Sequence, residues 1–204
     1  MNIVIVDYGL GNLGSILNML KYLNIEAEIS NNYQSISDAK KLILPGVGSF
    51  DNGMKNLKSS GLYDILNQEV MVNKKPILGI CLGMQLMTNS SEEGKDAGLG
   101  WVNASTKKFD FGPETGLKVP HIGWNRIKIQ HQVPLVSNLS DVAKFYFVHS
   151  YYISCHDSND IVSSTTFGIE FTSIFARGNV YGCQFHPEKS HKYGMSLLKN
   201  FNNI

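Results

Sequence analysis

The stretch Pro76-Ile-Leu-Gly-Ile-Cys-Leu-Gly-Met-Gln-Leu-Met87 joins a short apolar run to a helical pattern through a single cysteine. A nucleophile on such a sharp strand-to-helix turn is exposed at the edge of an α/β sheet. Gly79 and Gly83 flank Cys81 at positions where side chains on the two arms of a tight turn would collide. A helix N-terminus also favours the thiolate, which is the nucleophilic form of cysteine. The stretch therefore predicts a nucleophilic Cys81 between a buried strand and a helix.

Strands and helices alternate on both sides of this turn. Apolar runs typical of buried parallel strands occur at residues 2–6, 25–29, 41–44 and 76–80. Helical spacing occurs at 12–20, with Asn12 as the cap, and at 54–66, which is either one helix or two helical pieces divided at Gly61. The second half is strand-rich, with candidate strands at 127–130, 145–152, 161–167 and 180–185 before a helical pattern at 190–201. We therefore expect one α/β domain over residues 1–204, with a mostly parallel mixed sheet and an antiparallel portion.

The segment Phe185-His-Pro-Glu188 supplies two further groups that acyl transfer through a thioester requires. His186 is the candidate base, and Glu188 is the candidate carboxylate that orients the imidazole. On an extended segment both side chains would point to the same side, and Pro187 would stiffen the backbone between them. For either motif alone, the alternative is a structural role. Cys81 would then be a small buried apolar residue, and His186 a loop histidine whose hydrogen bonds are made within the protein. The two motifs in one chain favour a Cys-His-Glu triad.

A glycine-rich loop follows another apolar run in Leu42-Ile-Leu-Pro-Gly-Val-Gly-Ser49. Acyl transfer requires donors aimed at the developing oxyanion. The amide of Leu82, directly after the nucleophile, is one candidate, and the amide of Val47 in this loop is the other. Gly46 and Gly48 give the loop backbone the freedom to adopt, and to switch between, unusual conformations. Without the other motifs, an ordinary strand-to-loop turn would be the preferred interpretation.

These motifs resemble those of the class I glutamine amidotransferases, and in particular the glutaminase subunits of imidazole glycerol phosphate synthases. The resemblance runs nearly end to end and departs from the family at no catalytic position. It is carried by Asp7-Tyr-Gly-Leu-Gly-Asn-Leu13, Pro45-Gly-Val-Gly48, Gly79-Ile-Cys-Leu-Gly-Met-Gln85, Pro120-His-Ile-Gly-Trp-Asn125, Phe147-Val-His-Ser-Tyr151 and Gln184-Phe-His-Pro-Glu-Lys-Ser190.

The resemblance implies a flavodoxin-like three-layer fold and hydrolysis of glutamine by Cys81, His186 and Glu188. It also implies that the ammonia passes through a protected channel to a cyclase subunit, a (β/α)₈ barrel that makes imidazole glycerol phosphate and AICAR in histidine biosynthesis. The implied substrate-binding residues are Gly48, Gln85, Glu93, Ser150 and Tyr151, and the implied partner-interface residues are Asn12, His121, Trp124 and Lys189. For Glu93 a solvated acidic face with Glu92 is an open alternative. We interpret His121 and Trp124 as exposed residues of the interface, and the alternative is that they belong to a cluster of packed side chains.

Composition excludes several other classes of protein. A formal net charge of +1, with scattered Lys and Arg, argues against nucleic-acid binding. The three widely spaced cysteines fit reduced thiols and no zinc site, and we interpret Cys155 and Cys183 as structural. The chain enters a strand pattern at once and has no long apolar stretch, so we expect neither a signal peptide nor a membrane span. The expectation is a cytoplasmic enzyme without metal or cofactor.

Two other functions remain open at this point. The nearer one is a paralogue with the same chemistry that supplies ammonia for amination in surface polysaccharide synthesis. The farther one is a non-catalytic, nucleotide-binding regulatory module, because Gly9, Gly11 and Gly14 match the dinucleotide pattern between a strand and a helix. Under this hypothesis Glu28 would be the acidic residue that the dinucleotide pattern expects about twenty residues after the glycines.

Overall fold

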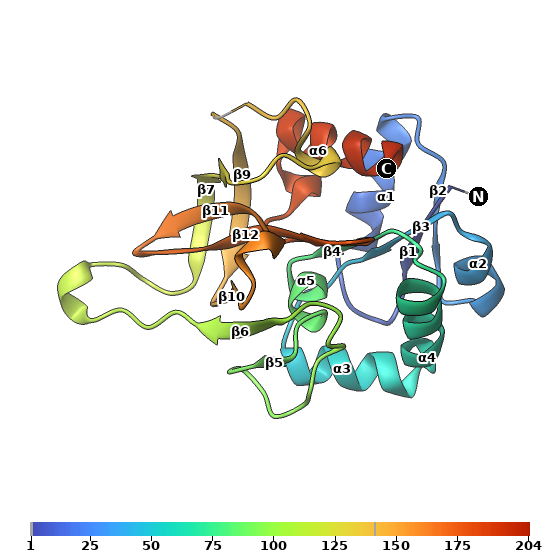
Figure 1. The fold of residues 1–204 in the computed structure, drawn as a ribbon, viewed down its shortest axis with the longest axis horizontal. Coiled ribbons are helices and arrows are strands. Elements are labelled where there is room, and N and C mark those ends of the chain that lie inside the picture. The colour runs from blue at the N-terminus through green and yellow to red at the C-terminus, as the bar shows by residue number, and fades with distance from the viewer. Residues whose placement is uncertain (1, 141) are drawn as a thin grey trace.

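The computed structural model describes residues 2–140 and 142–204, and an 11-stranded mixed sheet forms the centre of these residues (Figure 1). The main path of the sheet runs through β2 (Ala27–Ser30), β1 (Ile3–Val6), β3 (Lys41–Leu44), β4 (Ile77–Ile80), β13 (Val180–Cys183), β12 (Ile169–Arg177), β10 (Tyr151–Cys155), β6 (Ala104–Lys108) and β5 (Ser90–Ser91). Beside this path, β11 (Ile161–Phe167) pairs with β12 and with β8 (Lys128–Ile129). The predicted α/β fold with a mixed sheet is confirmed.

The change of strand direction lies close to the predicted active-site cysteine. From β2 through β1, β3 and β4 to β13, each pair of neighbouring strands is parallel. The next pairs, β13 with β12, β12 with β10 and β10 with β6, are antiparallel. Leu44 at the end of β3 is in register with Gly79 of β4. Because ligands of such sheets bind at the carboxyl ends of the parallel strands, loop 45–48 and Cys81 are placed at the same functional edge.

Helices cover both faces of the parallel strands, giving three layers (Figure 1). Ile3 and Ile5 of β1 pack in one core with α1 and α6, whereas Val4 and Val6 pack in the other core with α2, α3, α4 and α5. This division follows from the alternation of side chains along a strand. The helices are α1 (Leu13–Tyr22), α2 (Tyr33–Asp38), α3 (Phe50–Ser59), α4 (Leu62–Asn67), α5 (Leu82–Leu86) and α6 (His191–Asn203).

Of the two alternatives for residues 54–66, the structure has the second, two helices divided at Gly61. This residue has φ of 75° between α3 and α4, a left-handed conformation that strains any residue with a Cβ atom. After α4 the chain continues into a π-helical turn, Gln68–Val72, before β4 begins. Asn12 does occupy the cap position of α1, although its side chain makes no capping hydrogen bond.

The expectation of one strand over residues 145–152 is wrong. This segment is two strands: β9 (Lys144–His149) pairs with β7 (His121–Arg126) in a separate two-stranded sheet, and β10 begins at Tyr151. The buried residues Phe145, Phe147 and Ile153 lie an even number of positions apart on both sides of the break. A period of two residues therefore cannot reveal where the chain leaves one sheet for the other.

Several elements were not anticipated individually from the sequence. They are α2, β5, β6, β7 and β12. Helix α2 has only six residues, too few for its periodicity to stand out. Strand β7 contains Gly123 at φ of 135° and buries the polar His121, so its pattern is not that of an apolar strand.

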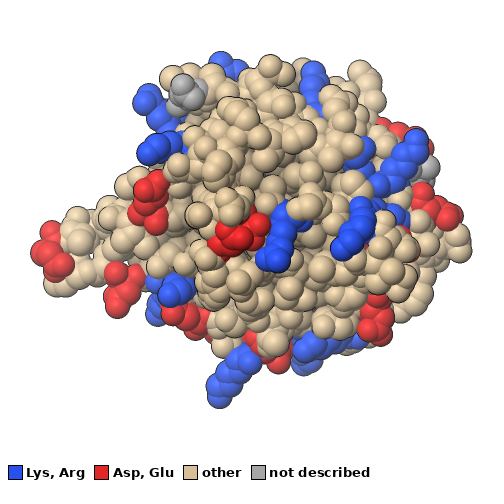
Figure 2. Space-filling view, in the orientation of Figure 1, with Lys and Arg blue, Asp and Glu red and all other residues tan. Residues whose placement is uncertain are grey.

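In residues 2–140 and 142–204, no helix combines the length and apolar character needed to cross a membrane. Basic and acidic side chains are interspersed on the face shown in Figure 2, and no single sign of charge dominates it.

Candidate active site

Cys81 occupies a strained turn between β4 and α5. Its φ and ψ are 54° and −111°, a conformation that L-residues rarely adopt and that persists only when the surroundings enforce it. A Cβ atom on Gly79 would lie 2.8 Å from the Met84 backbone, and one on Gly83 would lie 1.8 Å from the Leu44 carbonyl oxygen. Gly79 therefore permits the close approach of the two arms that the sequence predicts, whereas Gly83 permits the approach of α5 to the end of β3. Cys81 is the N-cap residue of α5, a position that favours a thiolate.

His186 and Glu188 form a buried pair. His186 Nδ1 lies 2.7 Å from Glu188 Oε1, and the two side chains are 3% and 1% exposed. The backbone explanation offered by the sequence is wrong, because Pro187–Lys189 is a 3₁₀ turn and not an extended segment. The fixed φ of proline suits the first position of a helical turn as well as a strand. The side chains nevertheless meet as expected.

The imidazole of His186 is tuned by its neighbours. Burial disfavours the imidazolium, but interactions with Cys81 and Glu188 outweigh this effect and raise the pKa of His186 to about 10. Nδ1 bonds to the carboxylate, whereas Nε2 has no hydrogen-bond partner among the described residues. Nε2 is therefore the nitrogen left to exchange a proton with Cys81 or a bound substrate.

Loop 45–48 packs against the first turn of α5. A Cβ atom on Gly46 would lie 2.9 Å from the Gly83 nitrogen, so the two backbones are in close contact. The Tyr8 hydroxyl donates a 2.7 Å hydrogen bond to the Pro45 carbonyl and anchors the base of the loop. Gly48 has φ of 103°, which confirms that the loop uses backbone conformations open to glycine.

A cavity of about 350 Å³ connects these groups. It is lined by Val47, Gly48, Cys81, Leu82, Gln85, Glu93, Pro120, Val148, His149, Ser150, Tyr151 and His186. Both predicted oxyanion donors and all five predicted substrate-binding residues are in this set. The sequence did not identify three of the lining residues, Pro120, Val148 and His149. Each lies inside or beside a motif that carries the family resemblance, which was the available signal.

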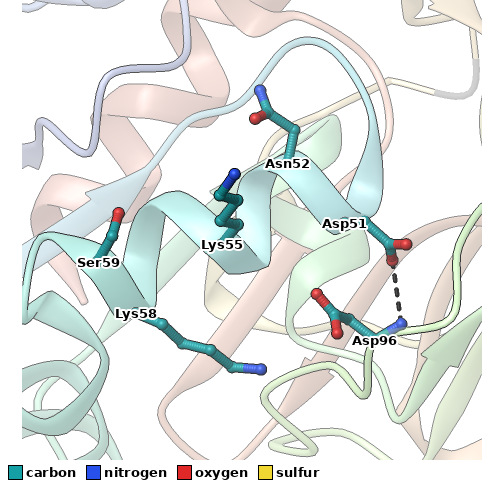
Figure 3. Close-up of a pocket in the computed structure, with 6 residues that line it drawn as sticks. All are labelled: Asp51, Asn52, Lys55, Lys58, Ser59 and Asp96. Atoms are coloured by element: carbon teal, nitrogen blue, oxygen red, sulfur yellow. Dashed lines mark hydrogen bonds between the residues drawn. The ribbon is translucent and has the colours of Figure 1, made fainter.

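Glu93 is held at the cavity by helix α3. Its Oε2 accepts a 2.8 Å hydrogen bond from the Phe50 amide, at the N-terminus of that helix. Asp51 then fixes the following loop, because its carboxylate accepts hydrogen bonds of 3.0 Å from the amides of Lys95 and Asp96 (Figure 3). These backbone bonds lower the pKa of Asp51, whereas burial raises the pKa of Glu93. Glu93 is thus a partly buried carboxylate and not part of a solvated acidic face.

A second, larger hollow of about 680 Å³ lies along α3 and is lined by Asp51, Asn52, Lys55, Lys58, Ser59 and Asp96 (Figure 3). None of the residues around Cys81 contributes to it. Its lining supplies no pair of nucleophile and base, so we assign the chemistry to the smaller cavity.

His121 is buried, at 4% exposure, and its predicted position on an exposed surface is wrong. Its ring stacks on Phe147 at a centroid distance of 5.0 Å and on Phe167 at 4.2 Å. The packing cluster, which was the alternative interpretation, is the correct one for this residue. The alternation along β7 explains the result, because Ile122 and Trp124 face outward at 60% and 46% exposure.

His121 and His149 form a hydrogen-bonded pair that ends at the cavity. His149 Nδ1 lies 2.8 Å from the Tyr151 carbonyl, and because a carbonyl only accepts, this nitrogen must carry the proton. In a neutral imidazole the other nitrogen, Nε2, then accepts from His121 Nδ1 at 3.0 Å. Burial lowers the pKa of His121 to about 4 and that of His149 to about 3, so both rings are neutral at pH 7.

This neutral pair predicts a pH dependence of stability. The unfolded chain binds protons at histidine near pH 6.5, whereas the folded pair resists them until about pH 4 or 3. The free energy of unfolding should therefore fall as the pH drops below about 6.5, by up to about 1.4 kcal/mol per pH unit for each histidine. His186 adds little slope well below pH 6.5, because the folded chain keeps this imidazole protonated up to about pH 10 and the unfolded chain is protonated there as well.

Replacing His121 by phenylalanine preserves a stacked ring and should reduce this slope, which urea titrations between about pH 4.5 and 7 would measure. Ile122→Phe changes an exposed neighbour on β7 and removes no titratable group, so it is the matched control and should leave the slope unchanged. Equal slopes in the wild type and the His121 variant would contradict the assignment.

Residues 4–203 match the family described as glutamine amidotransferase class-I. The chain belongs to the class I glutamine amidotransferases.

Relatives in this family extend over the whole chain. The chain is 55% identical to imidazole glycerol phosphate synthase subunit HisH 2 of Methanococcus maripaludis, over 98% of each chain. It is 49% identical to the subunit HisH 2 of Pseudomonas aeruginosa, again over 98% of each, and 46% identical to subunit HisH of Leptospira borgpetersenii over 97% of each.

Solved structures of more distant amidotransferases share the fold. A glutamine amidotransferase crystal structure matches with a TM-score of 0.73 at 19% identity, covering 98% of this chain and 99% of that one. The glutaminase domain of Trypanosoma brucei CTPS with bound acivicin matches with a TM-score of 0.66 at 15% identity, covering 100% and 94%. The predicted fold class is confirmed by these matches.

The remaining residues expected at a partner interface of this amidotransferase lie on the outside of the molecule. Trp124 is half-exposed and stacks on His191, with centroids 5.3 Å apart. The amine of Lys189 lies 5.7 Å above the Tyr146 ring, which also contacts Trp124 edge-on at 6.2 Å. Asn12 is exposed at the start of α1, which contacts the Pro187–Lys189 turn.

The glycine-rich loop at residues 9–14 has a structural explanation in this amidotransferase. Gly9 and Gly11 have φ of 84° and 118°, and a Cβ atom on Gly11 would lie 3.1 Å from the Pro45 side chain. The loop therefore packs directly on the start of loop 45–48. Gly11 permits this contact and Gly9 adopts a left-handed backbone, so two of the three glycines of the dinucleotide pattern have a structural role that involves no nucleotide.

Proposed function

We propose that this chain hydrolyses glutamine to glutamate and ammonia through a thioester on Cys81. The observation that carries the proposal is the strained Cys81 turn facing the His186–Glu188 pair across one cavity. Membership of the glutamine amidotransferase family supports the same substrate. The three unpaired thiols suit a reducing compartment, so we place the activity in the cytoplasm.

The reaction follows from the positions of these groups. The raised pKa of His186 favours the ion pair in which Nε2 holds the proton of Cys81, and the thiolate sulfur then bonds to the side-chain carbonyl carbon of glutamine. The carbonyl oxygen becomes an oxyanion stabilised by the amides of Leu82 and Val47. The carbon–nitrogen bond then breaks as His186 returns the proton to the departing ammonia. Water, deprotonated by His186, attacks the thioester, and the carbon–sulfur bond breaks to release glutamate and the thiolate.

Recognition of glutamine is assigned to the rest of the cavity. Glu93 is the carboxylate that would bind the α-ammonium group, because α3 holds it partly buried and facing the ligand. Gly48 and the backbone at Ser150 and Tyr151 would hold the polar ends of the substrate. Gln85 uses its amide nitrogen within the protein, on the Tyr151 carbonyl and on Gln184, so its oxygen is the atom free to accept from the substrate.

We further propose that the ammonia is passed to a cyclase subunit, a (β/α)₈ barrel, for synthesis of imidazole glycerol phosphate and AICAR in histidine biosynthesis. The relatives at 46% to 55% identity carry the name of that synthase. The partner would dock on the exposed Trp124 and Lys189, with Asn12 at the rim of the same surface. His121 would contribute from beneath, by supporting β7, and not by direct contact.

A second synthase remains a candidate partner. The relatives from Methanococcus maripaludis and Pseudomonas aeruginosa are both numbered 2 in their names, which points to more than one such subunit in those organisms. The alternative is the paralogue that serves amination in surface polysaccharide synthesis. Mixing the chain with each candidate synthase from its own genome would decide between them, because only the true partner should couple glutamine hydrolysis to product formation.

Partner binding is expected to raise glutamine turnover, because free release of ammonia would waste glutamine. The contacts between residues 9–14, Pro45 and the first turn of α5 provide a mechanical link from the docking surface to the oxyanion site. We expect the isolated chain to be at least about 10²-fold slower than the complex with the ligand of the synthase bound, which corresponds to one oxyanion donor.

Steady-state glutaminase rates of the chain alone, with its partner, and with the partner and its ligand would measure this activation. Lys189→Ala should weaken activation more than it raises the KM for glutamine, and Lys192→Ala, an exposed lysine on α6, is the matched control. Equal rates in all three states would instead indicate a free-standing amidase.

A further inference from the structure

Gln184 connects the nucleophile to the substrate side of the cavity. It follows Cys183, the last residue of β13, and its side chain is fully buried. Its Nε2 lies 3.7 Å from the sulfur of Cys81, within hydrogen-bond distance for sulfur. The backbone of Gln184 is fixed as well, because its amide donates a 2.9 Å hydrogen bond to the Ser173 carbonyl on β12. A buried amide held in this way contacts the reacting atom itself.

The orientation of this amide is dictated by a chain of hydrogen bonds. The Tyr151 carbonyl can only accept, so Gln85 must present its nitrogen to it, at 3.2 Å. The same nitrogen donates to Gln184 Oε1 at 3.1 Å. Gln184 therefore has its oxygen committed to Gln85, and its nitrogen must face Cys81. The reverse orientation would place an oxygen against the sulfur and two nitrogens against each other.

We propose that Gln184 is a hydrogen-bond donor to Cys81 that stabilises the thiolate and fixes the direction of its attack. The proposal rests on the proposed role of Cys81 as the nucleophile. A thiolate buried among apolar groups is disfavoured unless a donor or a cation offsets its desolvation. His186 supplies the cation after it has accepted the proton, and Gln184 supplies the donor.

No atom of Gln184 changes its bonding partners covalently during the reaction. The proton leaves Cys81 for His186, and the amide N–H of Gln184 remains on its nitrogen, since an amide is not a base at neutral pH. The hydrogen bond strengthens as the sulfur becomes negative and weakens in the thioester, whose sulfur is uncharged. The donor therefore favours the thiolate both at the start of the reaction and as the leaving group in thioester hydrolysis.

The test compares the full-length wild-type chain with Gln184→Met and Gln184→Glu. Methionine fills a similar volume without a donor, whereas glutamate keeps the shape and the bond from Gln85 but turns an oxygen towards the sulfur. The measurement is the pH at half-maximal rate of Cys81 alkylation by iodoacetamide, with peptide mass spectrometry to separate Cys81 from Cys155 and Cys183. Steady-state glutamine turnover in the complex with the synthase is measured alongside.

Both variants should raise the alkylation midpoint by about one pH unit, which is about a 10-fold loss of thiolate at neutral pH. Glutamine turnover should fall at least about 10-fold as well, and the change should be larger in kcat than in KM. The synthase reaction with added ammonium should stay normal, which would show that the complex is folded. Ser163→Ala is the matched control, because it removes a buried 2.9 Å hydrogen bond to Ser173 without touching the sulfur. It should leave the midpoint unchanged.

If the role of Gln184 were purely structural, the variants would be less stable but the alkylation midpoint would not move. Unchanged midpoints in folded variants would therefore overturn the proposal and leave the glutaminase assignment in place. A wild-type complex with no glutamine turnover would overturn both.

Discussion

Replacing Cys81 by alanine should lower glutamine hydrolysis by more than about 10³-fold, because no other described group in the cavity can form the thioester. Stability should change little, because alanine also carries a Cβ atom and suffers the same strain at φ of 54°. The Cys81 side chain is small and 8% exposed, so its loss leaves only a minor void. Turnover assays of the complex and thermal unfolding of the chain would measure the two effects separately.

Added ammonium provides the internal control for this variant. The synthase reaction should proceed at its normal rate with ammonium, because that step does not use the thiol. Cys155→Ala is the matched variant, and it should retain glutamine turnover, because burial raises the pKa of that thiol to about 11 and keeps it protonated. Normal glutamine turnover by Cys81→Ala in the complex would disprove the nucleophile assignment.

The parallel half of the fold could be predicted because its signals are local. Strands β3 and β4 are continuous apolar runs, and Gly61 marks the break between α3 and α4 by its left-handed conformation. The Cys81 turn could be predicted for the same reason, since Gly79 and Gly83 are needed within two residues of it. Most of these features depend on interactions among neighbours in the sequence, although Gly83 also permits the approach of Leu44 from β3.

The antiparallel half could not be predicted in the same detail, because its pattern depends on which strands pair. The buried residues Phe145, Phe147 and Ile153 keep an even spacing although the segment changes sheets at Ser150. His121 was mistaken for a surface residue because nothing in the sequence shows that a histidine on β7 will stack on Phe147 and Phe167. Both errors arise from contacts between distant segments.

The candidate site shows the same limit. The three triad side chains could be chosen from two local motifs, but no pattern in the sequence connects Gln184 with Cys81, which is 103 positions away. Nor could it show that Asp51 fixes the loop after Glu93. Residues that bear chemistry are recognisable by type and spacing, whereas residues that orient them are recognisable only from the folded geometry.

The second large effect is expected at His186, with a smaller one at Glu188. His186→Ala removes the group that both accepts and returns the proton, so turnover should fall by about as much as in Cys81→Ala. Glu188→Gln leaves the imidazole in place but removes the charge that orients Nδ1 at 2.7 Å. Its loss should be about 10- to 100-fold smaller, as for the carboxylate of other triads.

The pH dependence separates the two roles. In the wild type, Cys81 and Glu188 hold the pKa of His186 near 10 against the opposing effect of burial. The stability that this charged pair contributes is present below about pH 6.5 and is lost as the pH rises towards about 10. Glu188→Gln removes one of the two favourable interactions, so both this loss and the alkaline limb of glutaminase activity should move to lower pH. Titration of His186 by NMR in the wild type and in Glu188→Gln would follow the shift directly, and a pKa that stays near 10 without the carboxylate would assign the tuning of the imidazole to Cys81 alone.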